Sequence, residues 1–215
     1  MLKTVPKKSE ILTDTWQQIS WQYFLQLTNQ SVYKNGKFYY DRGYMKIEMS
    51  PLGMSHGRDN AIVARLISLF ATLKNIPVVE FTNVSYRKAE IRECQPDSSF
   101  YLGKVANLPT RSNQAIDLNQ YAPPTLVIEI ATTSLGDDLG SKRLLYEKLG
   151  VHEYWVINTN NYDVIAFEII DGGSREIQIS NVLPGLEISL VKTALERSEN
   201  ADDGEVNRWL IKLFS

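Results

Sequence analysis

One short segment, residues 125–131 (TLVIEIA), constrains both the fold and the chemistry of this chain. It is almost entirely apolar and β-branched, a pattern typical of a strand that is buried on both faces of a sheet. Glu129 lies in the middle of this segment. An unpaired carboxylate there would cost several kcal/mol or take up a proton, so the sequence predicts a partner for it. That partner is either a bound cation or a lysine or arginine of the core.

Three helices are predicted by apolar residues that recur at helical spacing. They span residues 15–28, 55–75 and 138–149. We expect Ser55 to cap the second helix, and Asp138 and Gly150 to begin and end the third. A short helix is also expected near the C-terminus, where it would dock through Val206, Trp209, Leu210 and Leu213.

Strands are predicted where β-branched and aromatic residues gather between turn residues. Residues 78–103 are expected to form two strands. Two more are expected near 153–158 and 163–170, with Asn160-Asn161 as the turn between them. Upstream, Asn35-Gly36 is a hairpin turn signal in an aromatic segment that ends at Pro51 and Gly53. The order of these elements implies an α/β fold, with a mixed β-sheet flanked by α-helices.

The chain has 215 residues, which suits one large domain. We expect an N-terminal extension at 1–19, the main domain at 20–191, and a charged tail with a short helix at 192–215.

Composition limits the classes of protein to which the chain can belong. No apolar run approaches the roughly 18 residues that span a bilayer, and the basic N-terminus lacks the apolar stretch of a secretory signal. Cys94 is the only cysteine, so a disulfide framework and a cysteine-based zinc site are excluded within one chain. These features predict a cytoplasmic protein with no membrane partner. The net charge of −2 weighs against strong non-specific binding of nucleic acid, but it does not exclude a nuclease.

A second carboxylate, that of Asp97, follows Pro96 in a strand-like stretch upstream of Glu129. Two strands of this kind can place an aspartate and a glutamate side by side. Mg²⁺ prefers oxygen ligands of this type, because it uses one or two carboxylates and keeps several waters. Such an ion can polarise a phosphodiester and make a bound water nucleophilic near neutral pH.

Several pieces of the sequence resemble the Uma-type restriction endonucleases, a family of the PD-(D/E)XK nuclease superfamily. The downstream pieces are Gln95-Pro96-Asp97, residues 126–130 (LVIEI), Asp138-x3-Lys142-x3-Tyr146 and residues 150–156 (GVHEYWV). The upstream piece is Glu48 to Pro51, followed by His56 at the head of the long helix. The resemblance covers residues 20–190, and the GVHEYWV run is its most specific part.

The resemblance implies an endonuclease-like core that hydrolyses DNA with the help of Mg²⁺, or of Mn²⁺ in its place. It implies that Asp97 and Glu129 are the metal ligands and that DNA is the partner. Glu48 and His56 are accessory candidates on the helix side of the site.

The chain departs from the superfamily pattern at Ala131, where a lysine is expected two residues after the glutamate. Positions 129 and 131 lie on the same face of a strand. Lys142 could supply the missing ammonium from the following helix and act as the third catalytic residue. The alternative is that Lys142 pairs with Asp138 or Tyr146 one turn away, an interaction worth a few tenths of a kcal/mol.

Three functions stay open at this point. The first is a Mg²⁺-dependent DNA endonuclease, which the spacing of Asp97, Glu129 and Lys142 favours. The second is a catalytically silent nuclease scaffold that binds DNA or a protein partner, which Ala131 and the net charge of −2 favour. The third is a homodimer module that uses the aromatic hairpin as its interface.

Overall fold

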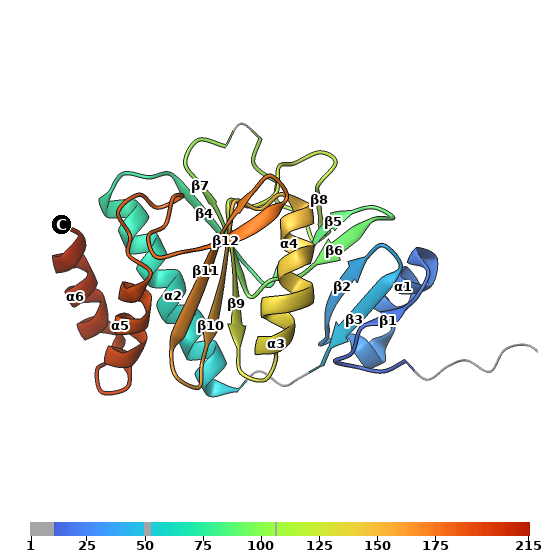
Figure 1. Cartoon of the computed structure of the whole chain (residues 1–215), viewed down its shortest axis with the longest axis horizontal. Helices are drawn as coiled ribbons and strands as arrows, with labels where there is room; N and C mark the ends of the chain where they lie inside the picture. Colours follow the sequence, from blue (N-terminus) through green and yellow to red (C-terminus); the bar gives the residue numbers. More distant parts are fainter. Residues whose placement is uncertain (1–10, 50–52, 106) are drawn as a thin grey trace, which may run out of the picture.

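The computed structural model describes residues 11–49, 53–105 and 107–215 and places them in two six-stranded sheets with helices packed around them (Figure 1). Residues 1–10 of the predicted N-terminal extension, and the predicted end of the aromatic segment at Pro51, lie outside the described residues. The predicted class, a mixed α/β fold with helices flanking the strands, is confirmed. The strands form two sheets, however, and the space between these sheets is where the predicted site residues meet.

The large sheet has the strand order β12-β11-β10-β9-β7-β4. Its strands β9 and β10 are parallel and its other neighbours are antiparallel, so the sheet is mixed. Strand β9 is buried along its whole length, as its apolar sequence predicts. The strands are β4 (Val78–Thr82), β7 (Ser98–Leu102), β9 (Leu126–Ala131), β10 (Glu153–Asn158), β11 (Asp163–Ile170) and β12 (Gly173–Ile177).

Two helices, α2 (Met54–Leu73) and α5 (Ser189–Ser198), cover one face of the large sheet, and α6 (Asp203–Phe214) packs on the outside of these two helices (Figure 1). The cap of α2 is Gly53, so the predicted Ser55 cap is wrong, and Ser55 lies within the first turn. Helix α5 was not anticipated from the sequence. None of the helices in the described part of the chain is long and apolar enough to cross a bilayer.

The C-terminal helix α6 begins with a capping box formed by Asp202 and Glu205, which satisfies backbone groups at both positions. Its buried residues follow helical spacing and are Val206, Leu210 and Phe214. Trp209 packs against the same core at its edge. Leu213 was expected to dock but is 47% exposed, because Phe214 continues the buried face instead.

The opposite face of the large sheet carries one helical segment in three parts. These are α3 (Leu135–Asp137), a π-helical turn η2 (Asp138–Lys142) and α4 (Arg143–Leu149). Asp138 therefore does not begin the helix, because the segment starts after Ser134. Gly150 ends it in the left-handed conformation with φ 81°, as predicted. The π turn widens the helix where Asp138 and Lys142 are both buried, and such turns are frequent at functional sites.

The small sheet has the strand order β1-β3-β2-β6-β5-β8. One of its faces packs under helix α1 (Trp21–Thr28) through an aromatic cluster that includes Phe24, Phe38 and Tyr40. The predicted helix at 15–28 begins later than expected, because β1 pairs with β3. The strands are β1 (Gln17–Gln18), β2 (Lys37–Asp41), β3 (Tyr44–Glu48), β5 (Tyr86–Lys88), β6 (Arg92–Cys94) and β8 (Ile116–Asp117).

Two strand predictions are corrected by the small sheet. Residues 78–103 form four strands rather than two, because β5 and β6 leave the large sheet and join the small one. The hairpin of β2 and β3 turns at Arg42-Gly43, where φ is 45° and 93°, and not at Asn35-Gly36. Gly36 follows a short 3₁₀ turn, η1 (Ser31–Tyr33), and an added Cβ would lie 2.7 Å from the Met49 Sδ. This close approach explains the glycine.

Candidate active site

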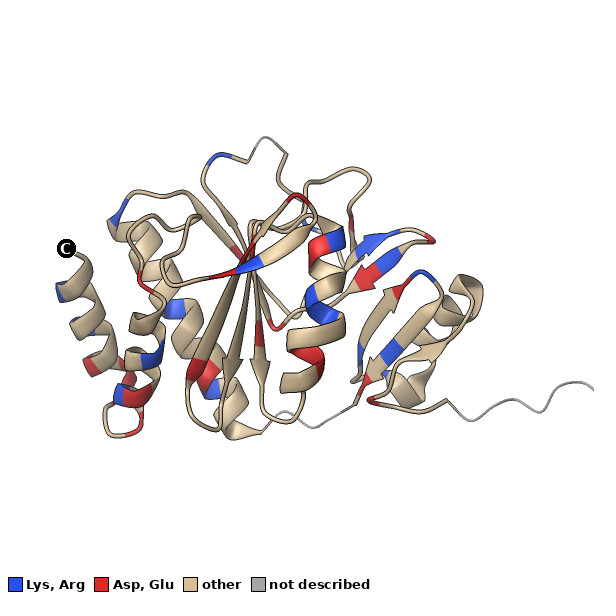
Figure 2. Ribbon diagram, in the orientation of Figure 1, with Lys and Arg blue, Asp and Glu red and all other residues tan. Residues whose placement is uncertain are grey.

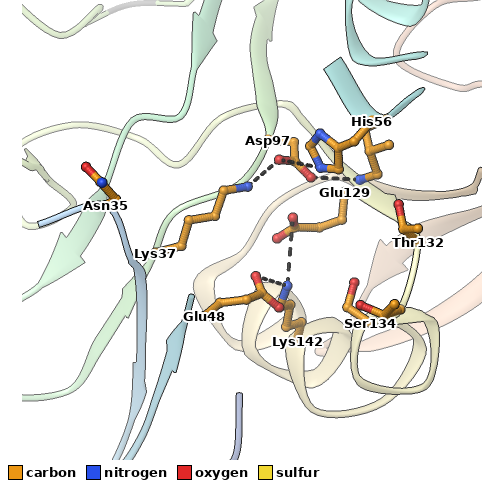
Figure 3. Close-up of a pocket in the computed structure, with 11 residues that line it drawn as sticks. Asn35, Lys37, Glu48, His56, Asp97, Glu129, Thr132, Ser134 and Lys142 are labelled. Atoms are coloured by element: carbon orange, nitrogen blue, oxygen red, sulfur yellow. Dashed lines mark hydrogen bonds and ion pairs between the residues drawn. The ribbon is translucent and has the colours of Figure 1, made fainter. Parts of the chain in front are cut away.

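A pocket of about 320 Å³ lies between the two sheets and the helical segment that begins at α3. Strands β2 and β3 of the small sheet form one wall, and the ends of β7 and β9 of the large sheet form another (Figure 3). Charged residues of both signs occupy β2, β3 and the helical segment that faces them (Figure 2). All five site residues predicted from the sequence line the pocket, namely Glu48, His56, Asp97, Glu129 and Lys142.

Strand register brings Asp97 and Glu129 together. Strands β7 and β9 are antiparallel, and Ser98 is paired with Ile128. Continuing this register by one residue places Asp97 opposite Glu129, on the same face of the sheet. The Oδ2 of Asp97 also accepts a hydrogen bond of 2.8 Å from the backbone N–H of Ile130, which holds Asp97 against β9.

Glu129 is 1% exposed and its environment is only partly polar. Its Oε1 accepts hydrogen bonds from the hydroxyls of Tyr146 at 2.7 Å and Tyr39 at 3.2 Å. Its Oε2 lies 3.9 Å from the Lys142 Nζ. Burial raises the pKa of Glu129 to about 8, although the charge of Lys142 acts in the opposite direction. Glu129 therefore holds a proton near neutral pH when no further cation is present.

Asp97 favours the ionised form, whereas Glu129 favours the protonated form, although the two carboxyl groups are almost equally buried. Its Oδ1 contacts the Lys37 ammonium and lies 3.2 Å from the His56 Nε2 (Figure 3). Burial would raise the pKa of Asp97, but the hydrogen bond from His56 and the charge of Lys37 outweigh burial and hold that pKa below its ordinary value. The two carboxylates are thus poised differently, with Asp97 ionised and Glu129 neutral.

Lys142 is 1% exposed and lies among three carboxylates. Its Nζ is 2.8 Å from Asp138, 3.0 Å from Glu48 and 3.9 Å from Glu129. Burial would lower the pKa of Lys142, but these carboxylates together raise it well above its ordinary value. The alternative pairing of Lys142 with Asp138 is present, but it is deeply buried rather than on the surface.

Glu48 and His56 each contact one of the three predicted catalytic residues: Glu48 contacts Lys142 and His56 contacts Asp97. The carboxylate of Glu48 accepts from Lys142 and from Lys46, each at 3.0 Å. Burial would raise the pKa of Glu48, but the charges of these two lysines outweigh it and lower that pKa. His56, on the first turn of α2, reaches Asp97.

Lys37 and Tyr39 were not identified from the sequence. They alternate with Phe38 and Tyr40 along β2, so they point to the face away from α1. The alternation of polar and aromatic residues in this hairpin was visible. The sequence does not show that this face of β2 packs against Asp97 and Glu129 of the large sheet.

The fold and the carboxylate pair together place the chain in the restriction-endonuclease-like class. The chain belongs to the Uma2 family, whose model matches residues 21–199 and is described as "Putative restriction endonuclease". The family resemblance drawn from the sequence is thereby confirmed. The structure is similar to that of a putative nuclease belonging to DUF820 from Anabaena variabilis ATCC 29413. The TM-score is 0.57 at 18% identity, covering 82% of this chain and 99% of that chain, a likeness that establishes the fold. No curated protein matches the sequence.

Proposed function

We propose that this protein is a Mg²⁺-dependent endonuclease that hydrolyses phosphodiester bonds of DNA. The observation that carries the proposal is the pairing of Asp97 and Glu129 on one face of neighbouring strands, at the wall of an open pocket. Membership of a family of restriction-endonuclease type supports a nuclease function.

The donor set at the pocket suits a hard cation that keeps part of its water shell. In the described part of the chain, three or more His, Cys, Asp or Glu side chains do not converge as a ready-made ligand cluster. A metal ion here would be held by Asp97 and Glu129 and would take its other ligands from water and a phosphate oxygen, as Mg²⁺ commonly does. Mn²⁺ shares this preference for oxygen ligands. When bound, such an ion polarises the phosphodiester and lowers the pKa of a bound water.

The surrounding side chains prepare the two carboxylates for this task. Tyr39 and Tyr146 both donate to the Oε1 of Glu129, which leaves the Oε2 of Glu129 on the side of Lys142. We assign Lys142 the role of balancing the charge of Glu129 and orienting the attacking water near it. His56 keeps Asp97 ionised, and Glu48 fixes Lys142 in place.

A second function, a silent nuclease scaffold that binds DNA or a protein partner, is favoured by position 131. Residue 131 is an alanine where the superfamily pattern has a lysine, so β9 offers no ammonium next to Glu129. Lys142 is also engaged by three carboxylates. A scaffold would bind its partner without cutting DNA.

The decisive test is cleavage of plasmid and linear duplex DNA with Mg²⁺, with Mn²⁺ and with a chelator. We expect cleavage with either metal and none with the chelator. Asp97→Asn should remove it, because the only permanently ionised ligand is lost. Asp163→Asn is the matched control, since Asp163 is an exposed aspartate on β11 that pairs with Lys192. Binding of duplex DNA by the wild-type protein without cleavage under any of these conditions would favour the scaffold.

A further inference from the structure

Two lysines line the pocket, Lys37 and Lys142, and Lys37 is the more exposed of the two. It is the first residue of β2 and is paired with Glu48 across the β2–β3 hairpin, so both side chains face the pocket. Its ammonium contacts the Oδ1 of Asp97 (Figure 3). The side chain of Lys37 is 12% exposed, whereas that of Lys142 is 1% exposed.

The two lysines differ in what would follow if each moved. Lys142 is held in the π turn by Asp138 and Glu48, and its departure would leave the buried carboxylate of Asp138 without a counter-charge. Lys37 neutralises Asp97 at the pocket wall, and Asp97 would keep its contact with His56 if Lys37 left. A long aliphatic stem that carries a compact charge allows such a movement. Lys37 is therefore the ammonium that can change partners.

The position of this ammonium coincides with that of a predicted metal ligand. Lys37 contacts the Oδ1 of Asp97, a carboxylate on which a divalent cation would depend. Two cations at one carboxylate repel each other, so a bound metal ion would drive the ammonium away from Asp97. The displaced ammonium would still face the pocket, into which the anionic backbone of the substrate must enter.

We propose that Lys37 is an exchangeable counter-ion: it neutralises Asp97 in the free protein and turns to a phosphate oxygen of the DNA when a divalent cation takes Asp97. This inference rests on the proposed function and adds a substrate-contacting residue to it. It also provides a substrate-facing positive charge in a chain that has Ala131 on β9 and in which Lys142 is buried against Asp138 and Glu48. An ammonium placed against the scissile phosphate stabilises the charge that develops there during hydrolysis.

The test compares Lys37→Gln with the wild-type protein and with Lys34→Gln, an exposed lysine outside the pocket. Mn²⁺ affinity is measured by titration calorimetry, and cleavage is measured in single-turnover experiments at saturating Mn²⁺. Lys37→Gln should bind Mn²⁺ about 10-fold more tightly, because a competing charge is gone. It should cleave about 100-fold more slowly. Lys34→Gln should match the wild-type protein in both measurements.

A second variant separates charge from structure. Lys37→Arg keeps the positive charge, so its Mn²⁺ affinity should stay at the wild-type value, while its larger planar group restores cleavage only in part. A Lys37→Gln protein that binds Mn²⁺ no more tightly than the wild-type protein would overturn the exchange. Unchanged cleavage in that variant would overturn the phosphate contact.

The failure of the nuclease function can be distinguished from the failure of this inference. If the wild-type protein binds Mn²⁺ and duplex DNA without cutting, the nuclease function is wrong. Lys37 is then judged by duplex binding with and without Mn²⁺. A loss of affinity in Lys37→Gln that appears only with Mn²⁺ would support the exchange, and an equal loss in both conditions would overturn it.

Discussion

Two glutamates on adjacent strands are buried to the same degree, but their hydrogen-bonding environments differ. Glu129 on β9 is 1% exposed, and Glu153 on β10 is 0% exposed. They lie on opposite faces of the large sheet, because Glu153 is paired with Leu126 and Glu129 with Val156 in the parallel register. Glu153 faces the side covered by α2 and α5, and Glu129 faces the pocket.

Glu153 has its hydrogen bonds completed by neutral groups. The indole N–H of Trp155 and the hydroxyl of Ser180 donate to its Oε2, at 3.0 and 2.9 Å. The backbone N–H groups of Asn181 and Val182 donate to its Oε1. This carboxylate therefore ties the loop that follows β12 to the large sheet, and we interpret Glu153 as a structural residue of the GVHEYWV run.

In Glu129, by contrast, the hydroxyls of Tyr39 and Tyr146 both donate to Oε1. The Oε2 of Glu129 faces the ammonium of Lys142 at 3.9 Å. Burial in this setting raises the pKa of Glu129 to about 8. Burial of a carboxylate alone therefore does not identify a functional site. The informative feature is whether protein groups satisfy both oxygens of the buried carboxylate with hydrogen bonds, or whether one oxygen is left for a cation.

The largest expected difference between the two residues is in cleavage of DNA. Glu129→Gln should lower the single-turnover rate by about 1000-fold, since a metal ligand is lost at the point where charge develops. Glu153→Gln should leave the rate of the folded protein close to that of the wild-type protein. Equal losses of activity in the two variants, at matched folded fractions, would show that the different hydrogen-bonding environments of Glu129 and Glu153 do not distinguish a functional carboxylate from a structural one.

Stability should show the reverse order. Glu153→Gln places an amide NH₂ against N–H donors and should lower the free energy of unfolding by about 2–3 kcal/mol. Glu129→Gln should change it by less than about 1 kcal/mol near pH 4.5, because Glu129 is protonated in the folded protein there. Towards neutral pH this variant should become more stable than the wild-type protein, because the unfolded wild-type chain releases a proton that the folded chain keeps. Urea unfolding followed by circular dichroism measures both. A Glu129→Gln protein as unstable as Glu153→Gln would contradict the protonated state.

The pH dependence of stability sharpens the same contrast. The pKa of Glu129 is about 8 in the folded protein and near its ordinary value of 4.5 when the chain is unfolded. Between these pH values the folded state keeps a proton that the unfolded state has released. The contribution of Glu129 is therefore fully present below pH 4.5 and falls by about 1.4 kcal/mol per pH unit as the pH rises towards 8.

Urea unfolding of three proteins across this window isolates that contribution. The free energy of unfolding should fall more steeply with pH for the wild-type protein and for Glu153→Gln than for Glu129→Gln. Other titrating groups are common to all three and cancel in the differences. Parallel curves for the wild-type protein and Glu129→Gln would mean that Glu129 is ionised throughout.

The part of the site that could be predicted from the sequence is the part that is local along the chain. A glutamate within an apolar β-branched run identified Glu129, and the spacing of Asp138 and Lys142 placed both on one side of a helix. Gly150 was correctly placed at the end of that helix, because a left-handed residue there favours glycine. These inferences need only the periodicity and propensity of neighbouring residues.

The part that could not be predicted depends on contacts between distant segments. The sequence shows that Lys37 and Tyr39 share a face of β2, but not that this face meets Asp97 and Glu129. Similarly, the division of residues 78–103 between two sheets depends on which strands find partners, and local pattern does not determine it. The ion pair of Lys142 was expected to be weak and exposed if it formed, and its burial follows from the small sheet that closes over it.

The smallest expected effect concerns the two tyrosines that bind Glu129, and it tests whether they position a functional carboxylate. Tyr146 donates at 2.7 Å, whereas Tyr39 donates at 3.2 Å and also contacts the carbonyl of Gln95 at 3.0 Å. Tyr146→Phe should therefore slow cleavage by about fivefold, equivalent to about one hydrogen bond, and Tyr39→Phe by less. Tyr154→Phe is the matched control, because the Tyr154 hydroxyl donates to the Asp138 carbonyl and not to a carboxylate.

The pH profile of cleavage separates positioning from mere packing. Loss of a donor disfavours the ionised form of Glu129, so the pH at which cleavage reaches half its maximum should rise in Tyr146→Phe. In Tyr154→Phe the midpoint should stay at the wild-type pH even if the protein unfolds at a lower urea concentration. If Tyr146→Phe loses stability but keeps the wild-type midpoint of the pH profile, the Tyr146 hydroxyl of the wild-type protein serves only core packing. The contrast between Glu129 and Glu153 would then rest on Lys142 and the pocket alone.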